Sequence, residues 1–189
     1  MKIIGILGDI GSGKSFVAKS FGYPVFNADK EVGKIYQNDK KIFLKLKKAL
    51  PKYIFSFPVN KTEISKAILE NKSNLKRIVK IIHFEVRKKM NLFIKRNKDK
   101  KIIILDIPLL LENKINSKND VLVFIQTKKT EVNKRLRKRK NFNQKLINEF
   151  RNIQLPLDYK KRKAHFIIKN NFIKRTLKRD INYILNKIL

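Results

Sequence analysis

The chain has 189 residues, of which 42% are hydrophobic. It is therefore long enough for one globular domain with a hydrophobic core and too short for two domains of ordinary size. Its formal charge of +32 comes mainly from lysines spread along the whole sequence, and A/T-rich coding, which also favours asparagine and isoleucine, explains this better than a dedicated nucleic-acid surface. The absence of cysteine excludes disulfides, thiolate metal sites and cysteine nucleophiles.

Apolar runs and helical spacings alternate along the chain. In order, they predict a strand at 2–7, a helix at 13–21, a strand at 24–27, a helix at 30–50, an irregular stretch at 51–61, helices at 62–69 and 73–96, strands at 101–105 and 121–126, helices at 130–139 and 144–154, a strand at 166–168 and a helix at 174–189. Thr62 and Ser73 are the expected caps of their helices. We therefore expect an α/β protein with a doubly wound, five-stranded parallel sheet, formed by a single domain over residues 1–189.

The strongest candidate for a membrane span is the apolar stretch 102–111, which Asp106 and Pro108 interrupt. It is too short to cross a bilayer as a helix. The apolar N-terminal residues 1–7 are too few for the core of a signal segment. We therefore expect a cytoplasmic protein without a membrane partner.

A glycine-rich segment follows the first predicted strand. Residues 8–15 match the phosphate-binding loop G-x-x-x-x-G-K-S/T, with a strand before it and a helix after it. The glycines let successive backbone N–H groups point at phosphate oxygens, Lys14 adds a positive charge, and the Ser15 hydroxyl is a ligand for Mg²⁺. The sequence therefore predicts a P-loop NTPase-type site for ATP and Mg²⁺. The expected nucleotide-binding residues are Gly11, Ser12, Gly13, Lys14, Ser15 and Phe16.

Two aspartates follow predicted strands, at the edge where α/β sheets bind their ligands. We expect Asp29 to accept the proton of an acceptor hydroxyl, with an N-cap of the following helix as the alternative. We expect Asp106 to bind Mg²⁺ together with Ser15 and to contact the substrate. The alternative for Asp106 is a turn residue before Pro108.

Basic side chains complete the expected phosphoryl-transfer site. Arg135 and Arg139 are four residues apart and share one face of the predicted helix, within a basic lid at about 128–162. In this lid we expect Arg139 to act in catalysis by neutralising charge on the transferred group, against the alternative of a solvated face. His83 and Arg87, also four apart, are candidates for acceptor binding, against a structural role.

These motifs together resemble the dephospho-coenzyme A kinase family. The resemblance rests on residues 4–15, on Asn27-Ala28-Asp29 as the family's D-A-D element, on Ile82-His83 with Arg87 as its His-Pro-x-x-Arg segment, and on 106–112 as its D-x-P-L-L-x-E run. Towards the C-terminus, Arg139, Gln154, Lys160, Ala164 and residues 168–170 follow the order of its lid and adenine-side motifs. Four departures stand out, namely Asn27 for Asp, Phe84 for Pro, His165 for Asp and Phe16 for Thr.

The resemblance implies an enzyme that phosphorylates the ribose 3′-hydroxyl of dephospho-coenzyme A with ATP and Mg²⁺. It implies that Asp29 is the base, that the helical segment at about 60–97 binds the acceptor, and that Asn170 contacts the nucleotide. Gln154 and Lys160 are the implied substrate contacts in the lid. We expect a monomer with no specific nucleic-acid partner.

Other functions remain open at this point. The first is another small-molecule P-loop kinase, of the nucleoside-monophosphate or shikimate type. The second is a nucleic-acid-binding P-loop protein, which predicts tight and salt-dependent binding to DNA or RNA. The third is an inactive relative of the family, because Asn27 and His165 depart from its pattern.

Overall fold

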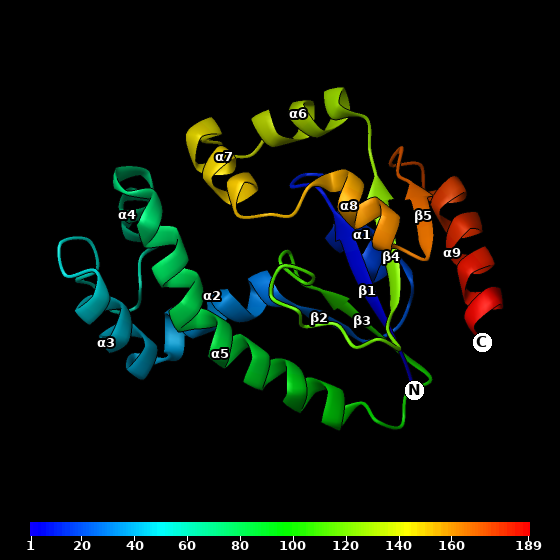
Figure 1. The fold of residues 1–189 in the computed structure, drawn as a ribbon, viewed down its shortest axis with the longest axis horizontal. Coiled ribbons are helices and arrows are strands. Elements are labelled where there is room, and N and C mark those ends of the chain that lie inside the picture. Colours follow the sequence, from blue (N-terminus) through cyan, green and yellow to red (C-terminus); the bar gives the residue numbers. More distant parts are fainter. The chain divides into compact units, whose positions relative to one another are not determined.

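The computed structural model describes residues 1–189 (Figure 1). Its elements are β1 (Lys2–Gly8), α1 (Lys14–Ser20), β2 (Val25–Asn27), α2 (Ala28–Asn38), α3 (Lys40–Ala49), α4 (Lys61–Glu70), α5 (Lys72–Arg96), β3 (Ile102–Asp106), β4 (Val121–Gln126), α6 (Lys129–Arg137), α7 (Gln144–Asn152), α8 (Leu157–Lys163), β5 (Phe166–Lys169) and α9 (Lys174–Ile188). No helix combines the length and the apolar character that a membrane crossing requires.

The five strands form one sheet in the order β2-β3-β1-β4-β5, and every neighbouring pair is parallel. Every residue of β3 is buried, and so are the four inner residues of β4. This burial is why both strands are almost continuously apolar in the sequence. The predicted α/β fold with a five-stranded parallel sheet is confirmed.

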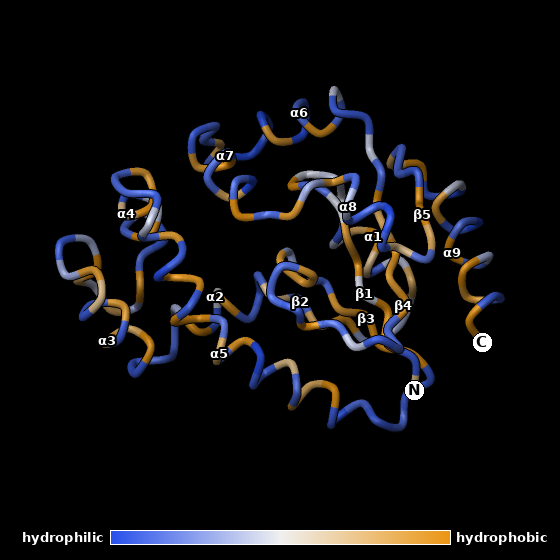
Figure 2. The backbone as a smooth tube through the Cα atoms, viewed as in Figure 1, coloured by the Kyte–Doolittle hydropathy of each residue, from blue (hydrophilic) through white to orange (hydrophobic).

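The two faces of the sheet are covered by different elements, because successive side chains of a strand point to opposite sides. On one face Ile4, Ile6 and Ile104 pack in a core that includes residues of α1 and α9. On the other face α8 contacts β1 and β4. Figure 2 shows β3 and β4 as largely hydrophobic and α9 as alternating between hydrophobic and hydrophilic residues.

Parallel pairing brings the carboxyl ends of all the strands to one edge of the sheet. The last residues of the five strands are Gly8, Asn27, Asp106, Gln126 and Lys169. In α/β folds this edge is where ligands bind. The phosphate-loop motif and Asp106 therefore belong to the same edge, although they are far apart in the sequence.

The chain groups into two compact units. The sheet unit consists of Met1–Asn27, Phe93–Phe142 and Gln154–Leu189. The helical unit consists of Ala28–Leu92 and Asn143–Ile153, and so contains α2, α3, α4, α7 and most of α5. The single domain expected over residues 1–189 stays a prediction.

The helical stretch expected at 30–50 is wrong as one element, because it is two helices. α2 begins at Ala28 and α3 begins at Lys40. Between them Asp39 is extended, and its side chain accepts a hydrogen bond from the Ile42 N–H at 3.0 Å. Apolar spacing continues across this N-cap, so the break has no signal in the hydrophobic pattern.

Both expected helix caps are shifted by two residues. Asn60, and not Thr62, caps α4 by accepting from the Thr62 N–H at 2.9 Å. At the start of α5, Asn71 accepts from the Ser73 N–H at 2.9 Å. Asparagine caps helices at least as well as serine or threonine, so at each helix start the sequence offered two adequate capping residues two positions apart.

The lysine- and arginine-rich residues 129–163 form three short helices where two were expected. α6 ends at Arg137, and α8 was missed because its sequence is mostly charged and has no apolar periodicity. The end of α6 also corrects the expectation that Arg135 and Arg139 share a helix face. Arg139 lies beyond the last helical residue and donates its N–H to the Leu136 carbonyl.

The sheet predicts a sharp contrast between an isoleucine of an inner strand and one of an edge strand. Ile104 is 0% exposed in β3, whereas Ile167 is 45% exposed in β5. Ile104→Ala is expected to lower the free energy of unfolding by about 2–5 kcal/mol, because it removes buried methyl groups and leaves a cavity. Ile167→Ala, the matched control, is expected to cost well under half as much in urea unfolding. Equal losses would contradict the described core.

Candidate functional site

The phosphate loop connects β1 to α1 through glycines in backbone conformations that other residues rarely adopt. Gly11 and Gly13 have φ angles of 85° and 89°. A Cβ atom on Gly13 would lie 2.5 Å from Asn170 Nδ2 and 2.8 Å from the ring of Phe172. Glycine is therefore required at this position both by backbone conformation and by close packing.

Two side chains that follow other strands bind the phosphate loop through the backbone carbonyl of Ser12. Asn170 Nδ2 and Thr127 Oγ1 each donate to the Ser12 carbonyl at 2.9 Å. Asn170 is 5% exposed, and its Oδ1 accepts from the Phe172 N–H. The structure thus gives Asn170, predicted as a nucleotide contact, a supporting contact to the loop. Thr127 was not predicted, and only its place directly after β4 could have indicated it.

The Lys14 side chain curls back over its own loop. Its Nζ donates to the carbonyl oxygens of Gly8 at 3.1 Å and Asp9 at 2.8 Å. Ser15 and Phe16 follow in the first turn of α1, where backbone N–H groups have no partner within the helix. The loop therefore collects N–H donors and one ammonium group at the carboxyl edge of the sheet, which suits a phosphate.

Asn27, Ser15 and Asp106 form a polar cluster beside this loop. Asn27 Nδ2 donates to Asp106 Oδ2 and lies 3.4 Å from Ser15 Oγ. Asp106 is 3% exposed, whereas Ser15 is exposed. A carboxylate and a hydroxyl are oxygen ligands of the kind that Mg²⁺ prefers. The donor set therefore fits the predicted metal, and Asn27 is a member that the sequence did not indicate.

Lys160 is buried in a charged network, with a side chain that is 2% exposed. Its Nζ lies 2.6 Å from Glu112 Oε1 and donates to Gln154 Oε1 at 3.1 Å. The same Glu112 oxygen accepts from the Leu155 N–H at 2.9 Å. The predicted substrate residues Gln154 and Lys160 thus meet each other, and Lys160 also pairs with Glu112, the last residue of the D-x-P-L-L-x-E run. Glu112 itself was not predicted as a site residue.

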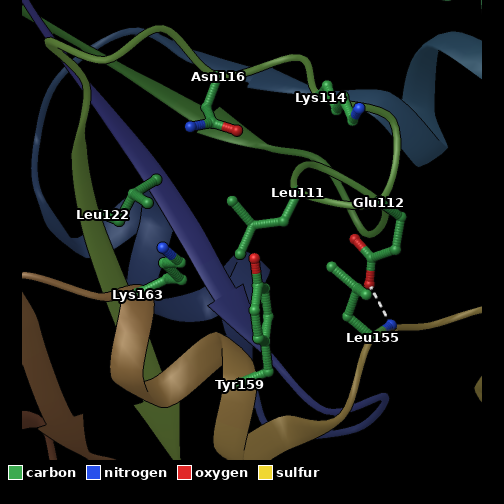
Figure 3. Close-up of a pocket in the computed structure, with 8 residues that line it drawn as sticks. All are labelled: Leu111, Glu112, Lys114, Asn116, Leu122, Leu155, Tyr159 and Lys163. Carbon is green, nitrogen blue, oxygen red and sulfur yellow. Dashed lines mark hydrogen bonds between the residues drawn. The ribbon is translucent and has the colours of Figure 1, made fainter.

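A cavity of about 480 Å³ lies beside this network (Figure 3). Its lining residues are Leu111, Glu112, Lys114, Asn116, Leu122, Leu155, Tyr159 and Lys163. Figure 3 shows Leu111 next to the Tyr159 ring, with Glu112 at one end and Lys163 at the other. Glu112 Oε2 is buried without a hydrogen-bond partner.

Of the two arginines expected to share a helix face, Arg135 has a defined aromatic partner. Its guanidinium lies 3.8 Å from the centre of the Phe172 ring, a typical cation–π arrangement. Phe172 in turn packs against the phosphate loop at Gly13. Arg139, predicted to act in catalysis, is exposed.

The helical unit carries the predicted base and two acceptor contacts. Asp29 is exposed in the first turn of α2 and is not the residue before the helix, so the N-cap alternative does not hold. His83 and Arg87 lie one turn apart on α5. His83 Nε2 is buried without a hydrogen-bond partner. Desolvation, and then the positive charge of Arg87, lower the pKa of His83.

The second histidine has a structural contact. His165 Nδ1 accepts a hydrogen bond from the Leu122 N–H at 2.9 Å, and the His165 N–H donates to the Leu122 carbonyl. The imidazole therefore acts as an acceptor at the start of β4, a task that a carboxylate can also perform. This contact accounts for a histidine where the family usually has aspartate.

The chain is similar in sequence to known proteins over most of its length. The family model described as Dephospho-CoA kinase matches residues 2–175. The dephospho-CoA kinase of Wolbachia sp. subsp. Brugia malayi (strain TRS) is 32% identical, over 98% of this chain and 97% of the relative. That of Bartonella quintana (strain Toulouse) is 34% identical, over 89% and 88%. The chain belongs to the dephospho-CoA kinase family.

Solved structures show the same fold at lower sequence identity. A protein from Thermus thermophilus superposes with a TM-score of 0.79 at 24% identity and covers 100% of this chain and 98% of that one. Dephospho-CoA kinase from Campylobacter jejuni gives 0.66 at 22%, with the same coverage. Shikimate kinase from Acinetobacter baumannii gives 0.53 at 16%, over 100% and 93%. The fold is thus that of P-loop kinases.

The buried ion pair predicts a large stability effect. Glu112→Gln leaves the Lys160 ammonium buried without its carboxylate, and is expected to lower the free energy of unfolding by about 3–5 kcal/mol. Glu31→Gln is the control, because its partner Lys34 is 61% exposed and such pairs contribute about 1 kcal/mol or less. Urea unfolding measures both. Similar losses in the two variants would contradict the network.

His83 predicts a dependence of stability on pH. Its folded-state pKa lies below its ordinary value of 6.5, so the unfolded chain takes up a proton first and stability falls as the pH falls through that range. His83→Gln is expected to lose less stability than the wild type between about pH 7.5 and pH 5.5 in urea unfolding. An identical loss in both proteins would contradict the shifted pKa.

Proposed function

We propose that this member of the dephospho-CoA kinase family transfers the γ-phosphoryl group of ATP to the ribose 3′-hydroxyl of dephospho-CoA. The products are CoA and ADP, so the reaction completes CoA synthesis. The observation that carries the proposal is the phosphate loop beside the Asn27, Ser15 and Asp106 cluster, in a chain that the family model matches over residues 2–175. Cytoplasmic location, a monomeric state and the absence of a specific nucleic-acid partner belong to the proposal.

The nucleotide phosphates would bind to the backbone N–H groups of the phosphate loop. Gly11, Ser12, Gly13 and Phe16 lie in or next to this loop, and Asn170 supports it through Ser12. Lys14 Nζ now donates to carbonyl oxygens at 2.8 and 3.1 Å. Phosphate oxygens carry more negative charge than carbonyls, so the ammonium would exchange these partners for the β- and γ-phosphates.

Ser15 and Asp106 would hold Mg²⁺ through a hydroxyl and a carboxylate oxygen. When bound, the metal supplies neutralisation of the phosphate charge and fixes the orientation of the phosphates. The protein's own contribution is to hold both ligands at one sheet edge next to Lys14. In this class of reaction, positioning and electrostatic stabilisation account for most of the catalysis.

Asp29 would accept the proton of the ribose 3′-hydroxyl. The acceptor oxygen forms a bond to the γ-phosphorus, the bond from this phosphorus to the bridging oxygen breaks, and ADP leaves with that electron pair. Arg139 would neutralise the charge that develops on the transferred group. Asp29 lies in the first turn of α2, where the positive end of the helix favours a negatively charged group.

The acceptor contacts remain predictions for four residues. The support is strongest for His83, because its Nε2 is buried without a hydrogen-bond partner. Its lowered pKa favours the neutral ring, in which one nitrogen accepts and the other donates a hydrogen bond. Arg87 on the same helix would contact a phosphate of the acceptor. Lys160 pairs with Glu112 and donates to Gln154, so these two residues would reach the substrate only by exchanging these contacts.

Measuring ADP release with a panel of acceptors tests the proposed reaction. With ATP and Mg²⁺, dephospho-CoA is expected to give one ADP and one CoA per turnover. Adenosine monophosphate and shikimate test the alternative kinases and are expected to give only background release. ADP formed equally with either of them, or without any acceptor, would contradict the proposal.

Asp29→Asn is expected to lower kcat by about 10²–10⁴-fold, because the amide cannot accept the hydroxyl proton. The affinity for ATP should stay within about twofold, since the phosphate loop is unchanged. Steady-state kinetics and nucleotide titration measure the two quantities. Asp99→Asn is the control, because Asp99 is 64% exposed and pairs with the neighbouring Lys100. A kcat like that of the wild type would remove Asp29 from the role of base.

A further inference from the structure

Asn27 lies where two neighbouring strands end side by side. β2 and β3 are parallel, with Asn27 in register with Asp106, and each is the last residue of its strand. The amide Nδ2 donates to Asp106 Oδ2 and lies 3.4 Å from Ser15 Oγ. One nitrogen therefore contacts both groups that would hold the metal.

The chemistry of the partners determines which end of the amide faces them. An ionised carboxylate only accepts hydrogen bonds, and the amide nitrogen carries two N–H groups, one for each partner. Asp106 is 3% exposed, so its charge requires a donor. Asn27 supplies this hydrogen bond through Oδ2, which orients the carboxylate and leaves Oδ1 for a metal or its water ligands.

The neutral amide also sets the charge of the cluster. The family's D-A-D element has a carboxylate at this position, whereas here an uncharged amide joins the Asp106 carboxylate to the Ser15 hydroxyl. Mg²⁺ takes six oxygen ligands, usually one or two carboxylates together with substrate phosphates and waters. A cluster with one carboxylate and one hydroxyl therefore binds a divalent cation weakly until phosphates join it.

We propose that Asn27 is a positioning residue that orients Asp106 and Ser15 for the metal–nucleotide complex. Its neutral amide makes divalent-cation binding depend on the nucleotide. The inference rests on the proposed function, because it takes this cluster as the metal–nucleotide site. It extends that function by assigning a role to one of the four residues at which the chain departs from the family pattern.

Binding of Mn²⁺, followed by electron paramagnetic resonance of the free ion, tests the inference without turnover. The wild-type protein is expected to bind Mn²⁺ at least about tenfold more tightly with ADP than without it. Asn27→Ala removes the hydrogen bond to Asp106, and should weaken Mn²⁺ binding in the ADP complex about tenfold or more. Asn27→Asp adds a second carboxylate and should tighten Mn²⁺ binding without nucleotide about tenfold or more.

Asn119→Asp is the control for added charge. Asn119 is exposed and precedes β4, so it lies at the opposite edge of the sheet from the cluster. This variant is expected to bind Mn²⁺ like the wild type. Thermal unfolding of each protein, with and without Mn²⁺ and ADP, separates the two possible roles of Asn27. A purely structural role would lower the Tm of Asn27→Ala and leave the rise produced by Mn²⁺ and ADP unchanged.

Three results would overturn the inference. The first is a wild-type affinity for Mn²⁺ that ADP does not increase. The second is an Asn27→Ala variant that binds Mn²⁺ in the ADP complex as tightly as the wild type. The third is an Asn27→Asp variant that, without nucleotide, binds Mn²⁺ no more tightly than Asn119→Asp does. If Asn27→Asp does not fold, the effect of ADP on the wild type and the comparison of Asn27→Ala with the wild type still test the inference. No acceptor is present in these measurements, so failure to phosphorylate dephospho-CoA would remove the proposed function and leave them interpretable.

Discussion

Asn27 and Asp106 are 79 residues apart in the sequence, and Ser12 and Asn170 are 158 apart, yet each pair is joined by a hydrogen bond. Both contacts depend on one constraint, the parallel direction of all five strands. Because every strand points the same way, the residues that follow the strands meet at a single edge. The phosphate loop is supported there by side chains that follow β4 and β5, and the polar cluster is assembled from the ends of β2 and β3.

The distribution of charge separates a general property of the chain from its site. The formal charge of +32 is carried mostly by exposed lysines, and such a field attracts polyanions without selecting among them. The buried charged side chains of the sheet unit, by contrast, are few, and each has a polar partner. Lys160, the one fully buried lysine, meets Glu112, and buried Asp106 meets the Asn27 amide. These fixed contacts hold individual groups in place, while the lysine excess affects how fast anions arrive.

The sequence predicted the sheet better than the contacts behind the site. Fully buried strands such as β3 are continuously apolar, so they could be located from the sequence, and the phosphate loop has a fixed spacing. The break at Asp39 was missed because the apolar spacing continues across it, and the cap at Asn60 was missed because nearby Thr62 offered an equally good cap. Thr127 and the Asn27 contacts were missed for another reason. Their roles exist only once the strands have paired, and no local pattern records which strand ends become neighbours.

A crystal structure with bound Mg²⁺ and ADP tests the central claim most directly, because that claim is about where phosphate binds. The account predicts the β-phosphate within hydrogen-bond distance of the N–H groups of residues 11–16. It also predicts that Lys14 Nζ moves from the Gly8 and Asp9 carbonyls to a phosphate oxygen, with Ser15 and Asp106 on the side of the metal. ADP bound away from this sheet edge, or a Lys14 side chain that keeps its carbonyl contacts beside bound phosphate, would contradict the account.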